Sequence, residues 1–153
     1  MQSLTYQGSE SLDDFVYSVN TALPKQLIEV ERRGVSARFV GDMATRMCVS
    51  YTHLSKMLGI SKATAARKLA KNEPINGTAA IAIARLLAIA NEIVKDSTDP
   101  DGSKFDTAKW LGQWIELPQP ALGGRKPSEL LDTPTGAAMV TKVLRAIRSG
   151  AYQ

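Results

Sequence analysis

The side chains that most enzymes use for nucleophilic or acid–base chemistry are scarce in this sequence. His53 is the only histidine and Cys48 the only cysteine, so no paired Cys/His zinc motif and no internal disulfide can form. The acidic pair Asp13 and Asp14 and the run DSTDPDG, residues 96–102, lack the spacing of a calcium loop. We therefore expect no catalytic residue, no metal and no cofactor, with Cys48 a small core residue and His53 at the surface or near a phosphate.

The second kind of chemistry that the sequence offers is ion pairing with a polyanion. Residues 32–72 carry nine Lys or Arg against one Asp, a net charge of +8. Residues 1–31 carry −4, residues 73–116 carry −3 and residues 117–153 carry +3. The overall charge of +4 therefore conceals one strongly basic segment, and a nucleic acid would prefer that segment.

The basic segment contains the run THLSKMLGISKATAARKLAK, residues 52–71. This pattern predicts two short helices with Gly59 in the turn between them and Ser61 as the N-cap of the second. Ser55 is small, as a close helix crossing requires four residues before that glycine, and Ala65 and Leu69 are expected to face inward. The pattern resembles the helix-turn-helix of bacterial DNA-binding domains.

In that motif the second helix enters the major groove of DNA. Lys62 and Arg67 are the residues there that can bind guanine edges strongly. We expect DNA contacts from six residues: Thr52, Ser61, Lys62, Arg67, Lys68 and Lys71. Because Ala63, Ala66 and Ala70 offer at most a thymine methyl contact, most of the affinity would come from phosphates and would fall with salt. The alternative is that this corner only packs or dimerises and that its charges are solvated.

Apolar residues recur at helical spacing along almost the whole chain. Helices are expected at residues 23–31, 37–47, 52–58, 61–71, 78–95, 107–115 and 135–148, with little support for strands. The helix that begins with Thr78 as N-cap is apolar nearly all round, which fits a core helix and a dimer interface equally well. It is interrupted by Arg85 and is not expected to span a membrane. The polar run KDSTDPDGSK, residues 95–104, is the expected linker.

Prolines and glycines are concentrated in the run PQPALGGRKPSELLDTPTGAAM, residues 118–139. Gly123 and Gly124 permit a turn that side chains would block, and Pro127 suits the first turn of a short helix that Leu130 and Leu131 anchor. These prolines and glycines restrict the backbone and fix the angle between the flanking helices, so we expect a rigid docking surface.

The same region carries a longer pattern. Trp110 is followed by PALGGRKPSELLDTPTG, residues 120–136, and then by Val140, Val143, Leu144, Ile147, Gly150 and Tyr152. This pattern resembles the toxin-binding C-terminal domain of the Xre/MbcA/ParS antitoxins, which pair with RES-domain toxins. The helix-turn-helix lies where that family has its Xre-like domain, so the resemblance covers residues 27–153. It implies an all-α protein with an Xre-like helix-turn-helix domain followed by a small helical toxin-binding domain.

The resemblance also implies a function. The protein would be the antitoxin of a type II toxin–antitoxin system, and its C-terminal module would cover the active site of a RES-type toxin that degrades NAD or uses it for ADP-ribosylation. The implied toxin contacts are Gly123, Gly124, Arg125, Pro127, Arg145, Arg148, Ser149, Gly150, Ala151 and Tyr152. Without the resemblance, Arg145 and Arg148 would read as a solvated face near the negative end of a helix.

The implied organisation has three parts. Residues 1–26 would be an N-terminal extension with no counterpart in the family, residues 27–96 the DNA-binding and dimerisation domain, and residues 105–153 the toxin-binding domain. The expected partners are a cognate RES-domain toxin, operator DNA and a second copy of the chain, without a membrane. The single cysteine and the lack of a leader favour the cytoplasm. The alternative is a stand-alone helix-turn-helix regulator whose C-terminal module oligomerises or binds a ligand.

Overall fold

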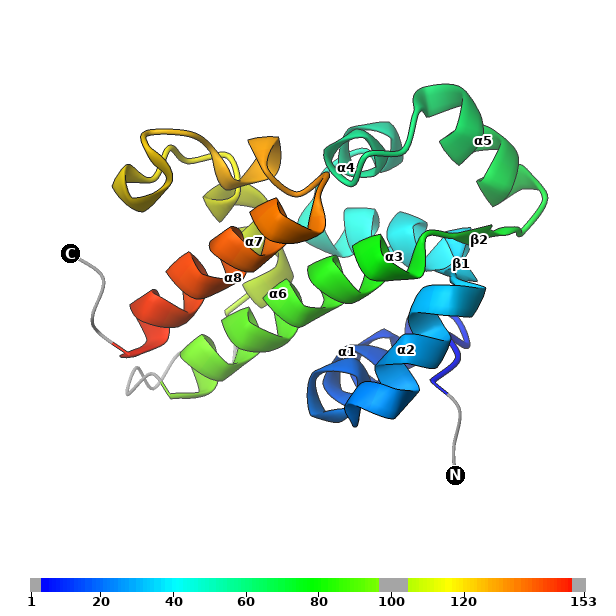
Figure 1. Ribbon diagram of the computed structural model, residues 1–153, viewed down its shortest axis with the longest axis horizontal. Helices are drawn as coiled ribbons and strands as arrows, with labels where there is room; N and C mark the ends of the chain where they lie inside the picture. The colour runs from blue at the N-terminus through cyan, green and yellow to red at the C-terminus, as the bar shows by residue number, and fades with distance from the viewer. Residues whose placement is uncertain (1–3, 97–104, 150–153) are drawn as a thin grey trace.

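A long apolar helix, α6 (Gly77–Lys95), runs through the middle of the computed structural model, which describes residues 4–96 and 105–149 (Figure 1). From Ala79 to Ala90 every residue is buried except Ala82 and Arg85, which are partly exposed. A helix without a polar stripe must be covered on most sides. Four helices provide that cover: α1 (Leu12–Thr21), α2 (Pro24–Arg33), α7 (Thr107–Trp114) and α8 (Pro134–Ser149). The structure therefore supports the core-helix interpretation of this segment.

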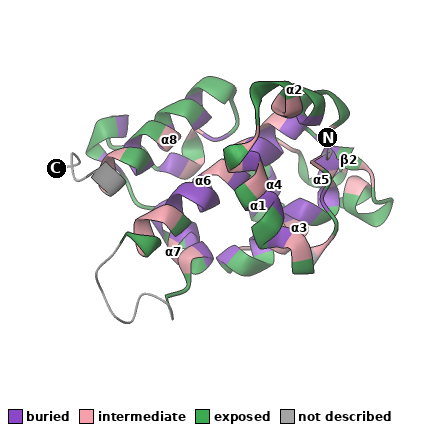
Figure 2. Ribbon diagram, turned by 90° about the horizontal axis from the view of Figure 1, so that it is seen from below, coloured by how far each residue is buried: buried purple, intermediate pink, exposed green. Residues whose placement is uncertain are grey.

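The length and composition of α6 alone would also allow it to cross a membrane. That is weak evidence, because the core helix of a soluble protein satisfies the same criteria. In this structure most of the helix is buried by its neighbours, as the purple segments of α6 in Figure 2 show.

The helix-turn-helix region consists of α2, α3 (Ala37–Met47), α4 (Tyr51–Met57) and α5 (Lys62–Ala70). A serine stands before each of the last three helices and accepts an otherwise unpaired backbone N–H in the first turn. Ser36 accepts from Arg38 at 3.2 Å, and Ser50 accepts from His53 at 3.0 Å. Side-chain capping of this kind defines where the helices begin.

Two short strands join this region to the start of α6. β1 (Val35–Ser36) pairs antiparallel with β2 (Pro74–Ile75). Gly34 precedes β1 with φ +81°, and a Cβ at this position would lie 2.5 Å from the carbonyl oxygen of Ile75. The sequence did not predict these strands because two residues give no alternating pattern to detect.

The N-terminal segment is part of the same core. After the 3-10 turn η1 (Ser9–Ser11), α1 buries Leu12, Phe15, Val16 and Val19. The rings of Tyr6, Phe15 and Phe39 form one cluster, with centroids 5.0–5.5 Å apart. The Tyr6 hydroxyl donates to Asp42, and burial together with this carboxylate raises the pKa of Tyr6. Residues 4–22 thus contribute to the folded body, although the sequence suggested no role for them.

The C-terminal region consists of α7, two 3-10 turns and α8. The turns are η3 (Pro120–Leu122) and η4 (Pro127–Glu129). α7 packs closely on α3, since Gly112 has no side chain to separate the two helices. A Cβ on Gly112 would lie only 2.3 Å from the carbonyl oxygen of Met47. α8 begins where the Thr133 hydroxyl accepts the N–H of Gly136 at 3.0 Å. Buried residues from every α-helix except α5 form one hydrophobic cluster.

The prediction of an all-α protein with a helix-turn-helix is confirmed, and each expected helix begins and ends within two residues of its predicted bounds. Three details were wrong. Asn76, not Thr78, caps α6, because its side chain accepts the N–H of Thr78 at 2.8 Å. The short helix at Pro127 is a single 3-10 turn. Cys48 is exposed, since it ends α3 in the left-handed conformation with φ +60°. Most of the expected linker, residues 97–104, lies outside the described residues, and the division into three domains stays a prediction.

Truncating Phe15 tests whether α1 is part of the core. Phe15→Ala removes a buried ring that packs on Tyr6 and Phe39, so we expect it to lower the free energy of unfolding by about 3–5 kcal/mol. Tyr17 on the same helix is 69% exposed, and Tyr17→Ala should change that free energy by no more than about 0.5 kcal/mol. Urea denaturation measures both values. Equal midpoints for the two variants would mean that α1 is an appendage.

Candidate functional site

The corner between α4 and α5 has the tight geometry that the sequence predicts. Gly59 adopts φ +82°, and the Ile60 N–H donates to the Ser55 carbonyl at 2.9 Å. Ser55 and Ala65 are buried, as the close crossing of the two helices requires. The expectation for Leu69 was wrong: its side chain is 37% exposed at the rim of the corner. It lies beside Gly41 of α3, which has no side chain to cover it.

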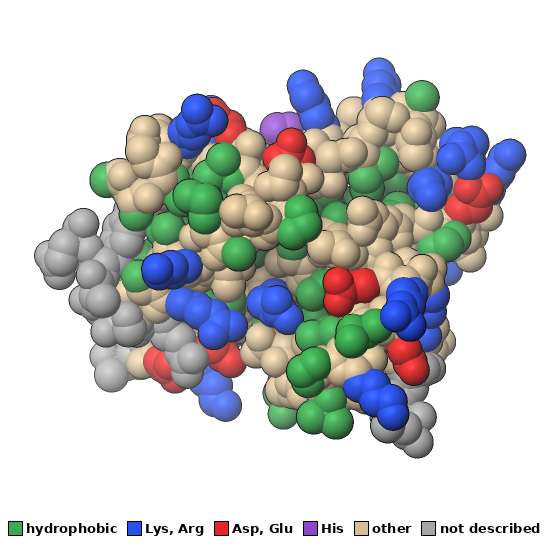
Figure 3. Space-filling model, in the orientation of Figure 1, with side chains coloured by type: hydrophobic (Ala, Val, Ile, Leu, Met, Phe, Trp, Pro, Cys, Tyr) green, Lys and Arg blue, Asp and Glu red, His purple; other side chains and the backbone are tan. Residues whose placement is uncertain are grey.

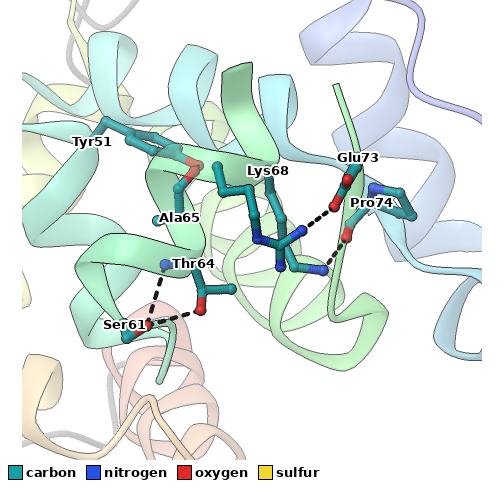
Figure 4. A network of polar contacts seen from close by, with 8 residues as sticks. Tyr51, Ser61, Thr64, Ala65, Lys68, Glu73 and Pro74 are labelled. Atoms are coloured by element: carbon teal, nitrogen blue, oxygen red, sulfur yellow. Dashed lines mark hydrogen bonds and ion pairs between the residues drawn. The ribbon is translucent and has the colours of Figure 1, made fainter. Parts of the chain in front are cut away.

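Two of the predicted DNA-contacting residues are held by the segment that leads into β2. Arg67 forms an ion pair with Glu73, Nη1 to Oε2, at 2.6 Å. Lys68 Nζ donates to the carbonyl oxygen of Pro74 at 2.8 Å. Figure 4 shows Lys68 reaching from α5 toward Pro74. The Arg67 side chain is 49% exposed, and a surface ion pair of this kind is weak enough to exchange for a phosphate.

The other predicted contact residues lie on the surface of the corner. Ser61 is exposed, but its hydroxyl is occupied as the cap of α5, where it accepts the N–H of Thr64 and donates to the Thr64 hydroxyl (Figure 4). Thr52, Lys62 and Lys71 are exposed. Among the described residues, neither lysine forms an ion pair within 4.0 Å. Of the four cationic residues predicted to contact DNA, the structure thus leaves Lys62 and Lys71 open to solvent and engages Arg67 and Lys68 within the chain.

The glycine–proline segment between α7 and α8 is a closed loop. The Gln119 N–H donates to the Arg125 carbonyl, and the Gly124 N–H donates to the Gln119 carbonyl, both at 3.0 Å. Gly123 and Gly124 have φ values of +68° and +81°, and Cβ atoms there would meet nothing within 4 Å. The backbone conformation, and not crowding, therefore requires glycine at both positions.

This loop is fastened to the helices on both sides. The Ser128 N–H donates to the carbonyl of Ile115 at 2.9 Å, and Pro127 is buried. A Cβ on Gly136 would lie 1.9 Å from the carbonyl oxygen of Leu130. These contacts hold the first turn of α8 in one position, which is the rigidity that the sequence predicts.

The residues that the resemblance assigns to toxin binding fall into three groups. Gly123, Gly124 and Arg125 are exposed on the loop, and Pro127 is buried beneath it. On α8, Arg145 is exposed, while Arg148 and Ser149 end the helix. Gly150, Ala151 and Tyr152 lie outside the described residues. η3 contacts α8, so the exposed loop and the helix belong to one surface, at the opposite end of the molecule from α5 (Figure 1).

Contacts between the two regions were not visible in the sequence. His53 Nε2 of α4 lies 2.9 Å from Glu116 Oε1, and Glu116 Oε2 lies 3.8 Å from Lys126 Nζ in the loop. The turn at Gly59 lies against Asp132, which would be 3.4 Å from a Cβ at that glycine. No sequence signal could pair His53 with Glu116 or Gly59 with Asp132, because the members of each pair lie more than sixty positions apart. His53 is exposed, as expected, and has a carboxylate as its neighbour.

No group of three or more His, Cys, Asp or Glu side chains that could hold a metal ion occurs in the part of the chain that the structure describes.

Comparison with known proteins gives matches over most of the chain. Residues 26–91 match the antitoxin Xre-like helix-turn-helix domain, and residues 104–150 match the antitoxin Xre/MbcA/ParS C-terminal toxin-binding domain. The chain is 34% identical over 134 residues to the Prs ADP-ribosylating antitoxin of Sphingobium sp. (strain YBL2), a similarity that covers 86% of this chain and 83% of that protein. No solved structure matches the chain significantly.

Substitutions at two glycines test how the loop and α8 are held. Gly124→Ala introduces no clash, but it forces a residue with a Cβ to adopt a positive φ. We therefore expect a loss of about 1–2 kcal/mol in the free energy of unfolding. Gly136→Ala places a methyl group in steric clash with the Leu130 carbonyl oxygen. This variant should lose more free energy of unfolding, because the start of α8 must move to relieve the clash. Chemical denaturation compares the two. A Gly136→Ala variant as stable as Gly124→Ala would show that this close approach does not fix α8.

Proposed function

The chain belongs to the Xre/MbcA/ParS antitoxin family, and from this we propose that it is the antitoxin of a type II system whose toxin is a RES-domain enzyme that consumes NAD. The observation that carries this proposal is the match of residues 104–150 to a toxin-binding domain. In the structure that domain is a loop with a fixed backbone that holds α8 against α6. The protein itself acts by binding and performs no catalysis.

The name of the Sphingobium relative supports the proposal that the toxin consumes NAD. That protein is called an ADP-ribosylating antitoxin, and ADP-ribosylation consumes NAD. We take the modification to be the reaction of its toxin partner. The toxin of the present chain would therefore possess a pocket for NAD, and the antitoxin would act by denying access to it.

The C-terminal end of α8, with the residues that follow it, is the part proposed to cover that pocket. Two mechanisms would exclude NAD: Arg145 and Arg148 pair with carboxylates of the toxin, or the tail fills the pocket by volume alone. The rigid loop favours either mechanism, because a helix held in one pose loses less conformational entropy on binding. Arg→Gln variants at both positions distinguish the two, since they remove charge and retain most of the volume.

A second role is autorepression through the helix-turn-helix. The support is the net charge of +8 on residues 32–72 and the exposure of Thr52, Lys62 and Lys71 on α4 and α5. Arg67 would leave Glu73 to reach a base or phosphate. Repressors of this type bind two half-sites as dimers, so a homodimer is part of the proposal. Binding to operator DNA and binding to an NAD-consuming toxin would both require a cytoplasmic location, which is part of the proposal.

Deletion of Arg148–Gln153 tests the antitoxin role. The shortened chain retains the hydrophobic core, so it should fold, and we expect it to lose protection when it is expressed together with the product of the adjacent reading frame, which the proposal takes to be the RES-domain toxin. Growth of the cells measures protection, and thermal denaturation of the purified variant verifies the fold. Tyr17→Ala, a change on the exposed face of α1, is the matched control and should protect fully. Full protection by the shortened chain would contradict the covering role of the tail, and a lack of protection by the full-length chain would favour the stand-alone regulator.

Alanine substitutions on α5 test the DNA role. Lys62→Ala should weaken binding to a fragment of the native promoter, and Lys71→Ala should lower the slope of log affinity against log salt by about one, the value for one lost phosphate contact. Arg67→Ala should have a smaller effect than Lys62→Ala, because Arg67 must first leave Glu73. Lys109→Ala on α7 is the control. Unchanged affinity and slope for all α5 variants at matched salt would exclude this corner as the DNA-binding surface.

A further inference from the structure

An open groove runs between α2, α6 and α8, next to the C-terminal surface described above. It has a volume of about 420 Å³, within the range of binding clefts, which is roughly 300–1,000 Å³. Each helix contributes one face at helical spacing. The small and apolar side chains that line the groove include Leu27, Ile81, Ala82, Ala137 and Ala138. Because alanines form much of the wall, the three helices leave a space that their own side chains do not fill.

Two guanidinium groups stand in this groove. Arg85 comes from α6 and Arg145 from α8, and Arg85 is the one polar interruption of the buried stretch of α6. Neither forms an ion pair within 4.0 Å in the described part of the chain. The only acidic side chain that lines the groove is Glu31 of α2. Figure 3 shows basic side chains over α6 and α8 on this face, separated by a hollow from the surface over α2, which carries apolar, acidic and basic side chains.

The groove is continuous with the surface proposed to bind the toxin. Its lining on α8 extends from Pro134 to Arg145, a distance of about 16 Å along the helix axis. Arg145 belongs to both surfaces, and Arg148 follows one turn later. A protein that covers the end of α8 therefore reaches the groove without crossing any other element.

We infer that this groove is a second docking site for the toxin and that it accepts a segment presenting apolar side chains beside a carboxylate. This inference rests on the proposed function. The apolar walls select against a nucleic acid backbone, which needs several exposed cations and no apolar floor. The two unpaired guanidiniums select for a carboxylate, since Arg pairs with planar acidic groups through two parallel hydrogen bonds. The α2 helix would thus contribute to toxin binding together with the C-terminal module.

Affinity measurements with the RES-domain protein encoded beside the gene test the inference. Ala138→Trp fills the groove from α8 and should weaken the complex by at least about tenfold, as loss of a buried anchor does. Arg85→Gln removes one charge, keeps the shape and should weaken the complex by about fivefold or more, with a smaller dependence on salt. Met139→Trp and Lys142→Gln alter neighbouring exposed positions of α8 that do not line the groove, and both should bind within about twofold of the unaltered protein.

The same measurements on the chain that lacks Arg148–Gln153 separate this inference from the proposed function. Groove variants that bind normally while the shortened chain does not would overturn the groove and leave the proposed function intact. Weakened groove variants beside an unaffected shortened chain would support the groove and contradict the covering role of the tail. If Ala138→Trp changes only the mass of the antitoxin in sedimentation, a second copy occupies the groove and the inference is wrong. Should Ala138→Trp fail to fold, Arg85→Gln decides the outcome, because Arg85 lines only the groove.

Discussion

The fold depends on the apolarity of α6. Between Ala79 and Ala90 this helix has no continuous polar stripe, and each large aliphatic side chain that it buries contributes about 1.5–3 kcal/mol of transfer free energy. Water cannot solvate such a surface favourably, so other elements must cover it. α1, α2, α7 and α8 do so, and two of them lie on each side of α6 in the sequence. The regions that match two separate family models are therefore joined in one core.

This shared core has a consequence for function. α5 and the exposed loop near α8 lie at opposite ends of one body, and α4 connects the two regions through the contacts of His53 with Glu116 and of Glu116 with Lys126. A toxin bound to the C-terminal module would contact the same folded body that holds α5 in position. The exposed ion pairs in this connection are individually weak, so the packing of α6 and α8, and not the charges, keeps the two surfaces in a fixed relation.

Positions fixed by neighbours along the chain were predictable, and positions fixed by distant neighbours were not. Gly59, Ser61 and the glycines at 123 and 124 follow local rules of turn and cap geometry, and the structure places them accordingly. The inward orientation of Leu69 failed because Gly41, far away in the sequence, provides no cover. The role of α1 was missed because its partner surface on α6 is more than fifty residues distant. The site residues proposed for DNA and toxin binding remain predictions.

The sequence alone determined the helices from α2 to α8, the corner at Gly59, the turn at Gly123 and Gly124 and the family resemblance, because periodicity, capping and turn chemistry act over a few residues. The tertiary structure decided that Arg67 pairs with Glu73, that Cys48 is exposed and that Arg85 and Arg145 face one groove. These outcomes depend on which helix faces lie together after α6 is buried. Burial is a property of the whole chain, and no local pattern encodes which segments meet.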